Sequence, residues 1–227
     1  MTLNTLTGKR ILVTHADAFM GPAICQRLQS LGATVIADTD PLQALEAPAQ
    51  LIERVGTPDV LVANLAMPAP NTRAVEVEEQ EWQAVFASMV HPLMRLCKAA
   101  LPGMQARKAG KILLIGSAAA LRGMKRASSY SAARGAQLAY IQALGVEMAA
   151  DNIQINAIAQ NFVDNPTYFP PEVQANPRFQ QRLANEVPLG RLVSAEEDAE
   201  FVAYLCSDAA NCFVGQVFPL CGGWVTR

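Results

Sequence analysis

Three polar side chains have the types and spacing needed to remove a proton from a hydroxyl group. Ser117 follows a short apolar run, Tyr130 comes thirteen residues later, and Arg134 lies four positions beyond Tyr130. Residues i and i+4 share one face of a helix, so the Arg134 guanidinium can lie beside the Tyr130 phenol. An unperturbed tyrosine, with a pKa of about 10, is a poor base at neutral pH, but a cation about 4 to 6 Å away favours the phenolate. The pattern predicts a tyrosine base.

A tyrosine and an arginine at this spacing are also typical of an ordinary exposed helix face. The secondary structure around them is therefore needed to distinguish a catalytic pair from an exposed one. Six short runs rich in Val, Ile and Leu recur along the chain. They cover Arg10–Thr14, Thr34–Asp38, Asp59–Asn64, Lys111–Gly116, Ile153–Ile158 and Gln216–Leu220. Runs that are apolar on both faces are typical of strands buried inside a parallel sheet.

Longer segments with helical periodicity separate these strands. They cover Met20–Leu31, Leu42–Val55, Glu78–Arg107, Ser128–Ala150, Arg178–Glu186 and Ala195–Ser207. The alternation predicts an α/β fold, a Rossmann-like doubly wound parallel sheet of about six strands with helices on both faces. We expect a single domain over residues 1–227, a length typical of one domain. The irregular stretch 160–177 follows a strand end, where ligands of such sheets bind, and is a candidate site loop.

Composition and charge narrow the range of partners. Eighteen Lys and Arg against twenty Asp and Glu, with no block of one sign, predict no nucleic-acid partner. No apolar run is long enough to span a membrane and the first ten residues lack signal-peptide features, so we expect a cytoplasmic protein without a membrane partner. The five cysteines indicate buried, reduced thiols. With only two histidines, no metal site is expected.

Ser117, Tyr130 and Arg134 resemble, in type and spacing, the serine, tyrosine and fourth-residue base of the short-chain dehydrogenase/reductase fold. The resemblance covers nearly the whole chain, including Asp59–Asn64 and the closing Gly222–Gly223.

Four departures from that family argue against a dehydrogenase. The turn after the first strand has His15 and Phe19 in place of two of the three glycines that let a backbone approach a pyrophosphate. The interval 38–59 is about one helix long and leaves no room for the edge strand that usually walls the adenine. Met89 stands where a helix asparagine usually completes the proton relay. Arg134 replaces the usual lysine and, being always charged, cannot pass a proton onward.

A tyrosine base without a dinucleotide fingerprint resembles the halohydrin dehalogenases, a cofactor-free branch of the same fold. The segments Gly116–Ala120, Ala159–Asn161 and Val187–Leu192 are most similar to the B-type members. The resemblance implies a lyase that closes vicinal haloalcohols to epoxides with release of halide, and that opens epoxides with anions such as azide, cyanide or nitrite. It also implies a homotetramer built on the long helices 78–107 and 128–150.

The resemblance gives each member of the triad a role. Tyr130, as its phenolate, abstracts the hydroxyl proton, Ser117 donates a hydrogen bond to the substrate oxygen, and Arg134 lowers the Tyr130 pKa. The oxygen then displaces the neighbouring halide within the same molecule. This chemistry requires neither a hydride carrier nor a metal.

The resemblance also places a halide site at Phe19 and at the turn Asn161, Phe162 and Val163. Consecutive backbone N–H groups in a turn form an anion-binding concavity, and apolar walls suit a poorly hydrated anion. A plain loop, with Phe19 and Phe162 in the core, is the alternative interpretation.

Other residues near these positions have less specific interpretations. Tyr168 and Phe169 match aromatic substrate-pocket positions of the family, although packing alone explains them equally well. Asn64 is expected to make a structural hydrogen bond, His15 to fill the pocket beside Phe19, and Asp38 to be a solvated carboxylate at a strand end.

Two alternatives to a dehalogenase stay open at the level of sequence. One is an NAD(P)H-dependent reductase with a degenerate fingerprint, which tight NADH binding would support. The other is a non-catalytic, oligomerising member of the fold, which would neither release halide nor bind a dinucleotide.

Overall fold

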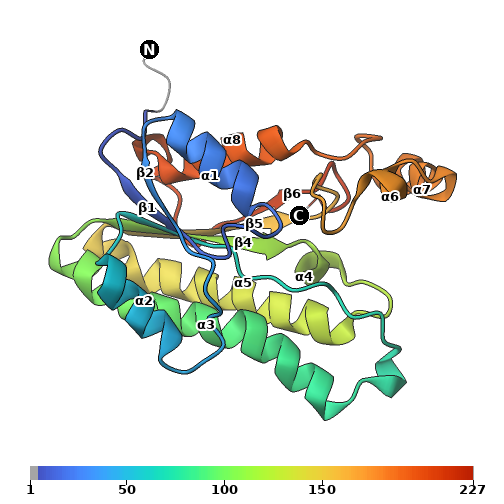
Figure 1. Cartoon of the computed structure of the whole chain (residues 1–227), viewed down its shortest axis with the longest axis horizontal. Coiled ribbons are helices and arrows are strands. Elements are labelled where there is room, and N and C mark those ends of the chain that lie inside the picture. The colour runs from blue at the N-terminus through green and yellow to red at the C-terminus, as the bar shows by residue number, and fades with distance from the viewer. Residues whose placement is uncertain (1–4, 227) are drawn as a thin grey trace.

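The computed structural model describes residues 5–226, which form a six-stranded parallel sheet covered by helices on both faces (Figure 1). The strand order is β2-β1-β3-β4-β5-β6. The strands are β1 (Arg10–Val13), β2 (Thr34–Ala37), β3 (Val60–Ala63), β4 (Gly110–Ser117), β5 (Ile153–Gln160) and β6 (Val217–Leu220). The predicted fold class is confirmed, because all six apolar runs form strands and every pairing between them is parallel.

Strands β4 and β5 form the longest parallel pair in the sheet. Eight residues pair along their whole length, and the last pair sets Ser117 beside Gln160. All positions of β3 and nearly all of β4 and β5 are buried, as continuously apolar strands require. The segment between β2 and β3 holds one helix and no strand, so the predicted loss of that edge strand is confirmed.

Two helical layers cover the sheet, as Figure 1 shows. One face carries α1 (Gly21–Ser30) and α8 (Ala195–Cys206), and the other carries α2 (Ala47–Val55), α3 (Glu79–Ala106) and α5 (Ser128–Met148). Helix α2 was predicted to begin at Leu42 but begins at Ala47. Pro48 fits its first turn because the missing N–H of proline needs no acceptor there.

Within residues 5–226, three short helices and three 3₁₀ turns connect the main elements. They are α4 (Ala119–Arg122), α6 (Pro171–Gln174) and α7 (Pro177–Glu186), with single 3₁₀ turns over Ala74–Glu76, Ala149–Asp151 and Asp208–Ala210. Of these, only α7 corresponds to a predicted helix. Helices α6 and α7 lie at one end of the sheet, beyond its carboxyl edge (Figure 1).

Contrary to the expectation that no apolar run is long enough to span a membrane, helix α3 is 28 residues long and apolar enough in composition to cross one. Its buried side chains include Val85, Met89, Leu93 and Leu96, and it packs against α2, α5 and β4. The apolar character of α3 is therefore that of a core helix.

The cysteines are all free, but not all of them are buried. Cys97, Cys206 and Cys221 lie in the core, as predicted, whereas Cys25 is half-buried and Cys212 is exposed. The prediction is wrong for Cys212 because the residues around it form a surface turn after α8 and not part of a helix or strand.

A glycine in α5 allows the helix to touch the backbone that leads into β6. A Cβ atom on Gly145 would lie 2.6 Å from the Gly215 nitrogen and 2.8 Å from the Ile155 carbonyl oxygen. Both neighbours are backbone atoms, so they cannot move aside without shifting β5 or the turn before β6. The position of α5, and of the side chains it carries, depends on this contact.

We expect Gly145→Ala to lower the free energy of unfolding by about 1 to 3 kcal/mol, the usual cost of overpacking a core. Gly135→Ala in the same helix is the matched control, because its Cβ meets no atom within 4 Å. That control should stabilise the protein by about 0.5 to 1 kcal/mol, since alanine loses less backbone entropy in a helix. Urea unfolding measures both, and equal stabilisation by the two substitutions would contradict the contact.

Candidate active site

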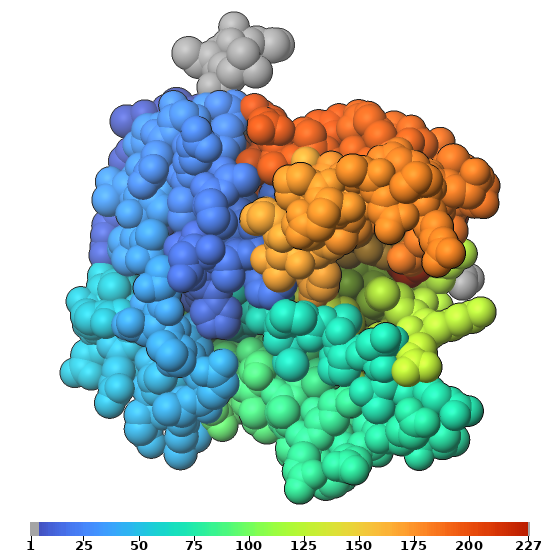
Figure 2. Space-filling model, turned by 45° about the vertical axis from the view of Figure 1, so that its right-hand side comes forward, coloured from blue at the N-terminus to red at the C-terminus, as the bar shows by residue number. Residues whose placement is uncertain are grey.

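A cavity of about 250 Å³ opens at the carboxyl edge of the sheet, above the ends of β4 and β5. Figure 2 shows the recess between the overhanging segment after β5, in orange, and the teal and green surface below it. Its lining includes the nine residues that the sequence analysis assigned to catalysis, halide binding and the substrate pocket. They are Phe19, Ser117, Tyr130, Arg134, Asn161, Phe162, Val163, Tyr168 and Phe169.

Arg134 is buried and directed at the Tyr130 hydroxyl. Its Nε donates a hydrogen bond to the Tyr130 oxygen at 3.1 Å. Its Nη1 lies 3.0 Å from the Leu65 carbonyl, 3.2 Å from the Ile115 carbonyl and 2.9 Å from Oε1 of Gln137. Because these acceptors come from the ends of two strands and from α5 itself, the guanidinium is held in one orientation. A fixed positive charge therefore adjoins the phenol.

The Tyr130 pKa lies below its ordinary value, although the residue is buried. Burial alone would raise it, but the positive charge of Arg134 and the hydrogen bonds that neighbouring side chains, Arg134 among them, offer to the phenol oxygen together outweigh that effect. The pKa of Tyr168 is raised instead, by burial and by the neighbouring Tyr130, and its hydroxyl donates to the Met67 carbonyl at 2.9 Å. Of these two phenols, Tyr130 is the one that ionises first.

Ser117 ends β4 at the floor of the cavity. Its Oγ accepts a hydrogen bond from the Ala119 N–H at 3.2 Å, and its one hydroxyl hydrogen can be donated either to Tyr130 or to a bound molecule. A serine hydroxyl carries one donor, so Ser117 can hold an oxygen atom of a bound molecule while Tyr130 lies within hydrogen-bonding range.

The turn 161–163 differs from the predicted row of free N–H groups. The Asn161 N–H donates to the Leu220 carbonyl, and the Phe162 N–H donates to the Asn161 side-chain oxygen at 2.9 Å. Pairing with β6 and a local side-chain bond thus occupy two of the three donors. Val163 has no acceptor for its N–H within residues 5–226, so it is the turn's remaining donor.

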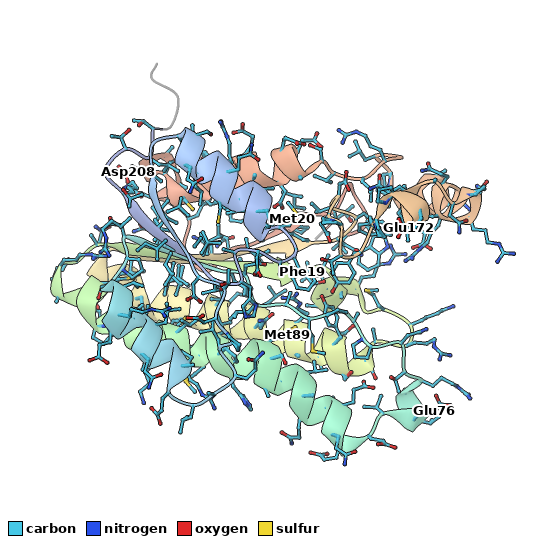
Figure 3. The ribbon with its side chains drawn as sticks, in the orientation of Figure 1. Phe19, Met20, Glu76, Met89, Glu172 and Asp208 are labelled. Carbon is cyan, nitrogen blue, oxygen red and sulfur yellow. The ribbon has the colours of Figure 1, made fainter. Side chains whose placement is uncertain are left out.

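Aromatic rings wall the cavity on the side of this turn. The ring centroids of Phe19 and Tyr168 lie 5.5 Å apart, and those of Phe162 and Phe169 lie 6.0 Å apart. Trp224 meets the edge of Phe162 at 6.0 Å. Figure 3 labels Phe19 where the turn after β1 reaches the carboxyl edge of the sheet. The structure thus brings Phe19 together with the aromatic residues of the segment 162–169 in one wall of the cavity, and Trp224 packs on Phe162 without lining the cavity.

Three of the less specific predictions have mixed outcomes. Asn64 makes the expected structural hydrogen bonds, to the carbonyls of His15 and Ala18, both at 3.0 Å. His15 does not line the cavity that Phe19 lines, so its prediction as a pocket-filling residue is wrong; it lies in the turn after β1 with a φ of 45°. Asp38 is not solvated but only 4% exposed, because Arg54 covers it with an ion pair of 2.9 Å.

The residues around the first turn do not fit a dinucleotide. Phe19 lines the cavity where a pyrophosphate would need an open backbone, and it packs on Tyr168. Asp38, which would hold a ribose, is sealed by Arg54 and does not line the cavity. Gly21 serves packing, since a Cβ there would lie 2.6 Å from the carbonyls of the same turn. Residues 5–226 also contain no cluster of three His, Cys, Asp or Glu side chains placed to bind a metal.

Some residues of the site were missed by the sequence analysis. Gln137 is fully buried, accepts from Arg134 and donates to the Met89 carbonyl at 2.8 Å. Its position, seven residues after Tyr130, is a helical spacing that could have revealed it. Arg182 of α7 also lines the cavity, with its guanidinium carbon 5.2 Å from the Phe162 ring. No sequence signal connects Arg182 to the cavity, because the path of the loop before α7 brings it there.

Residues 8–225 match the sequence family described as enoyl-(acyl carrier protein) reductase. The 3-oxoacyl-[acyl-carrier-protein] reductase FabG of Pseudomonas aeruginosa is 31% identical over 248 residues, which cover 96% of this chain and 98% of that protein. The chain belongs to the short-chain dehydrogenase/reductase family. The cis-4-hydroxycyclohexanecarboxylate dehydrogenase of Sinomonas cyclohexanicum, 33% identical over 84% of this chain and 74% of its own length, is a further relative.

Among solved structures, two similar ones carry a dehalogenase name. A structure described as a dehalogenation enzyme superposes with a TM-score of 0.89 at 31% identity, covering 97% of this chain and 99% of its own. Halohydrin dehalogenase HheC bound to ethyl (2S)-oxiran-2-ylacetate gives a TM-score of 0.88 at 30% identity, covering 96% and 98%. This short-chain dehydrogenase/reductase is thus similar to dehalogenases in structure and to ketoacyl reductases in sequence, at about the same identity.

We expect Arg134→Gln to raise the pKa of Tyr130, because it removes the adjacent positive charge. Arg134→Lys, which keeps the charge but loses the fixed geometry of the guanidinium, should give an intermediate pKa. Ultraviolet absorbance of tyrosinate against pH measures this, and subtraction of the Tyr130→Phe curve assigns the transition. The exposed Arg126→Gln is the control. A Tyr130 transition that stays in place in Arg134→Gln would refute the electrostatic role.

Proposed function

We propose that the protein is a halohydrin dehalogenase, a lyase that converts vicinal haloalcohols to epoxides without a cofactor and opens epoxides with small anions. The observation that carries this proposal is the Tyr130 phenol, held by Arg134 with a lowered pKa at the base of an apolar cavity. The similarity to dehalogenase structures over nearly the whole chain supports it.

In the proposed reaction, the Tyr130 phenolate takes the proton of the substrate hydroxyl, which Ser117 holds by a hydrogen bond. The resulting oxygen attacks the adjacent carbon, so that a carbon–oxygen bond forms as the carbon–halogen bond breaks. The halide leaves with the bonding electron pair, and the proton passes from Tyr130 to solvent. Arg134 stays charged throughout and acts on Tyr130 through its field.

The halide would be received between Phe19 and the turn 161–163. The Val163 N–H supplies a hydrogen-bond donor, and the rings of Phe19 and Phe162 supply apolar walls that suit a weakly hydrated anion. In the reverse direction the same place would hold azide, cyanide or nitrite before it attacks an epoxide.

A reductase that uses NAD(P)H is the second candidate, favoured by the sequence similarity to FabG. It would have to bind a dinucleotide across Phe19 and the sealed Asp38, which the residues present do not fit. Binding of NADH with a micromolar dissociation constant would support the reductase against our proposal.

We also propose that the chain forms a homotetramer through α3 and α5. These helices carry large apolar side chains at the surface, including Trp82, which is 37% exposed, Met94, 41% exposed, and Val146, 73% exposed. Pairing of such faces across two-fold axes buries them.

We expect the purified protein, without cofactor, to release chloride and acid in equal amounts from 1,3-dichloro-2-propanol. Tyr130→Phe should lower kcat/KM by at least about 10²-fold, because general-base catalysis contributes about 10² to 10⁴. The wild-type rate should rise with pH up to the pKa of Tyr130. Chloride release by Tyr130→Phe at the wild-type rate would refute the role of this residue, and its circular dichroism spectrum checks that it is folded.

We expect Phe19→Ala to weaken product inhibition by chloride and bromide about tenfold. Removal of one apolar wall should cost about 1.4 kcal/mol of halide binding free energy, which corresponds to a tenfold change in affinity. Phe201→Ala, in a separate aromatic cluster on α8, is the matched control. Inhibition constants from initial rates at several halide concentrations measure the effect. Equal constants for wild type and Phe19→Ala would place the halide elsewhere.

A further inference from the structure

Two polar residues that the proposed mechanism does not use lie together beside the cavity. Gln160 ends β5, pairs in register with Ser117 and lines the cavity. Its Nε2 donates a hydrogen bond to Oδ1 of Asp198, at 2.6 Å. Asp198 lies in the first turns of α8, thirty-eight residues further along the chain, and has no exposed surface.

The buried carboxylate of Asp198 is poorly compensated. Its Oδ2 has no hydrogen-bond partner within residues 5–226, and no cation pairs with it there. Burial raises its pKa to about 7, against which only the hydrogen bond from Gln160 acts. A buried, half-satisfied carboxylate costs stability, and an apolar side chain of similar size would avoid that cost. The one side-chain hydrogen bond of Asp198 is with Gln160, a residue of the cavity wall. A role in the site therefore accounts for a carboxylate at this buried position.

The carboxylate fixes the orientation of the Gln160 amide. An ionised Asp198 only accepts hydrogen bonds, so it must face the amide nitrogen of Gln160 and not the amide oxygen. The short distance fits a hydrogen bond to a charged acceptor. The carbonyl oxygen Oε1 is then the open end of the amide; it accepts no hydrogen bond from residues 5–226.

Several other polar side chains around the cavity already use their polar atoms within the protein. Tyr168 donates to the Met67 carbonyl, the Asn161 side-chain oxygen accepts from Phe162, and the Asn165 side-chain oxygen accepts from Tyr168. Asn64 uses its amide hydrogens on backbone carbonyls, and its Oδ1 is buried without a partner within residues 5–226. Gln160 differs from Asn64 in that its amide is oriented by a carboxylate and pairs in register with Ser117. An acceptor held open beside Ser117, in a mostly apolar space, recognises a ligand that brings a hydrogen-bond donor.

We propose that Gln160 is a specificity residue whose Oε1 accepts a hydrogen bond from a second donor on the substrate, a hydroxyl or amide N–H next to the reacting haloalcohol, and that Asp198 is the residue that positions it. This inference rests on the proposed function for the reacting group, but the recognition itself is a matter of binding. The preferred substrates are therefore halodiols and epoxy alcohols over the simple haloalcohols.

The experiment compares 3-chloro-1,2-propanediol with 1-chloro-2-propanol, which lacks only the additional hydroxyl. Affinities are measured by ligand-observed NMR at about pH 8, where Asp198 is mostly ionised, in a Tyr130→Phe background that prevents turnover. We expect the diol to bind about five- to tenfold more tightly, the usual effect of one hydrogen bond. Gln160→Leu should bring the two affinities together.

Asp198→Asn tests the positioning role, because an asparagine can donate to or accept from the Gln160 amide and no longer fixes its orientation. Its affinity ratio should fall between those of the parent and Gln160→Leu. Gln181→Leu, an exposed glutamine on α7 away from the cavity, is the matched control and should keep the parent ratio. A diol preference that survives in Gln160→Leu overturns the inference, and a parent ratio in Asp198→Asn overturns the role of Asp198.

Chloride release by the wild-type enzyme separates this inference from the proposed function. Turnover of 1-chloro-2-propanol supports the dehalogenase whatever the affinity ratio is. Absence of turnover with both compounds refutes the dehalogenase, while the binding ratios in the Tyr130→Phe background still decide the role of Gln160.

Discussion

The contact between Arg134 and Tyr130 is the constraint on which the rest of the site depends. Arg134 is only 3% exposed, so the donors of its guanidinium must be satisfied within the protein. The acceptors are carbonyls near the ends of β3 and β4 and the side chain of Gln137. The charge can therefore be buried only when α5 sits at a fixed height against the sheet. The close approach at Gly145 sets that height, so packing at one end of α5 and electrostatics at the other are linked.

The sheet and its main helices could be predicted because their signals are local. A run such as Val60–Ala63 is apolar at every position, and only a strand covered on both faces suits it. Asp38 shows where local reasoning fails. Its environment is decided by Arg54, sixteen residues away on α2, whose side chain reaches back over the strand end. Nothing in the sequence around Asp38 indicates that partner.

In the active site, too, the features that depend on local spacing could be predicted, and those that depend on tertiary contacts could not. Tyr130 and Arg134 could be paired from helix spacing alone, whereas the hydrogen bond between Gln160 and Asp198 requires knowing how α8 packs on β5. The turn 161–163 was located correctly, but the fate of its N–H groups depends on pairing with β6. Residue types at strand ends thus predict where a site lies, and tertiary contacts decide which of its donors and acceptors stay free.

The turn after β1 keeps a backbone path that suits glycine although it has lost glycines. His15 and Phe19 have φ values of 45° and 52°, a left-handed region that costs a side-chain-bearing residue roughly 1 to 2 kcal/mol. Substitution of either by glycine would relieve backbone strain and, at Phe19, reopen space in the cavity. The closed turn is therefore held at a cost in backbone energy that the packing of its two side chains must offset.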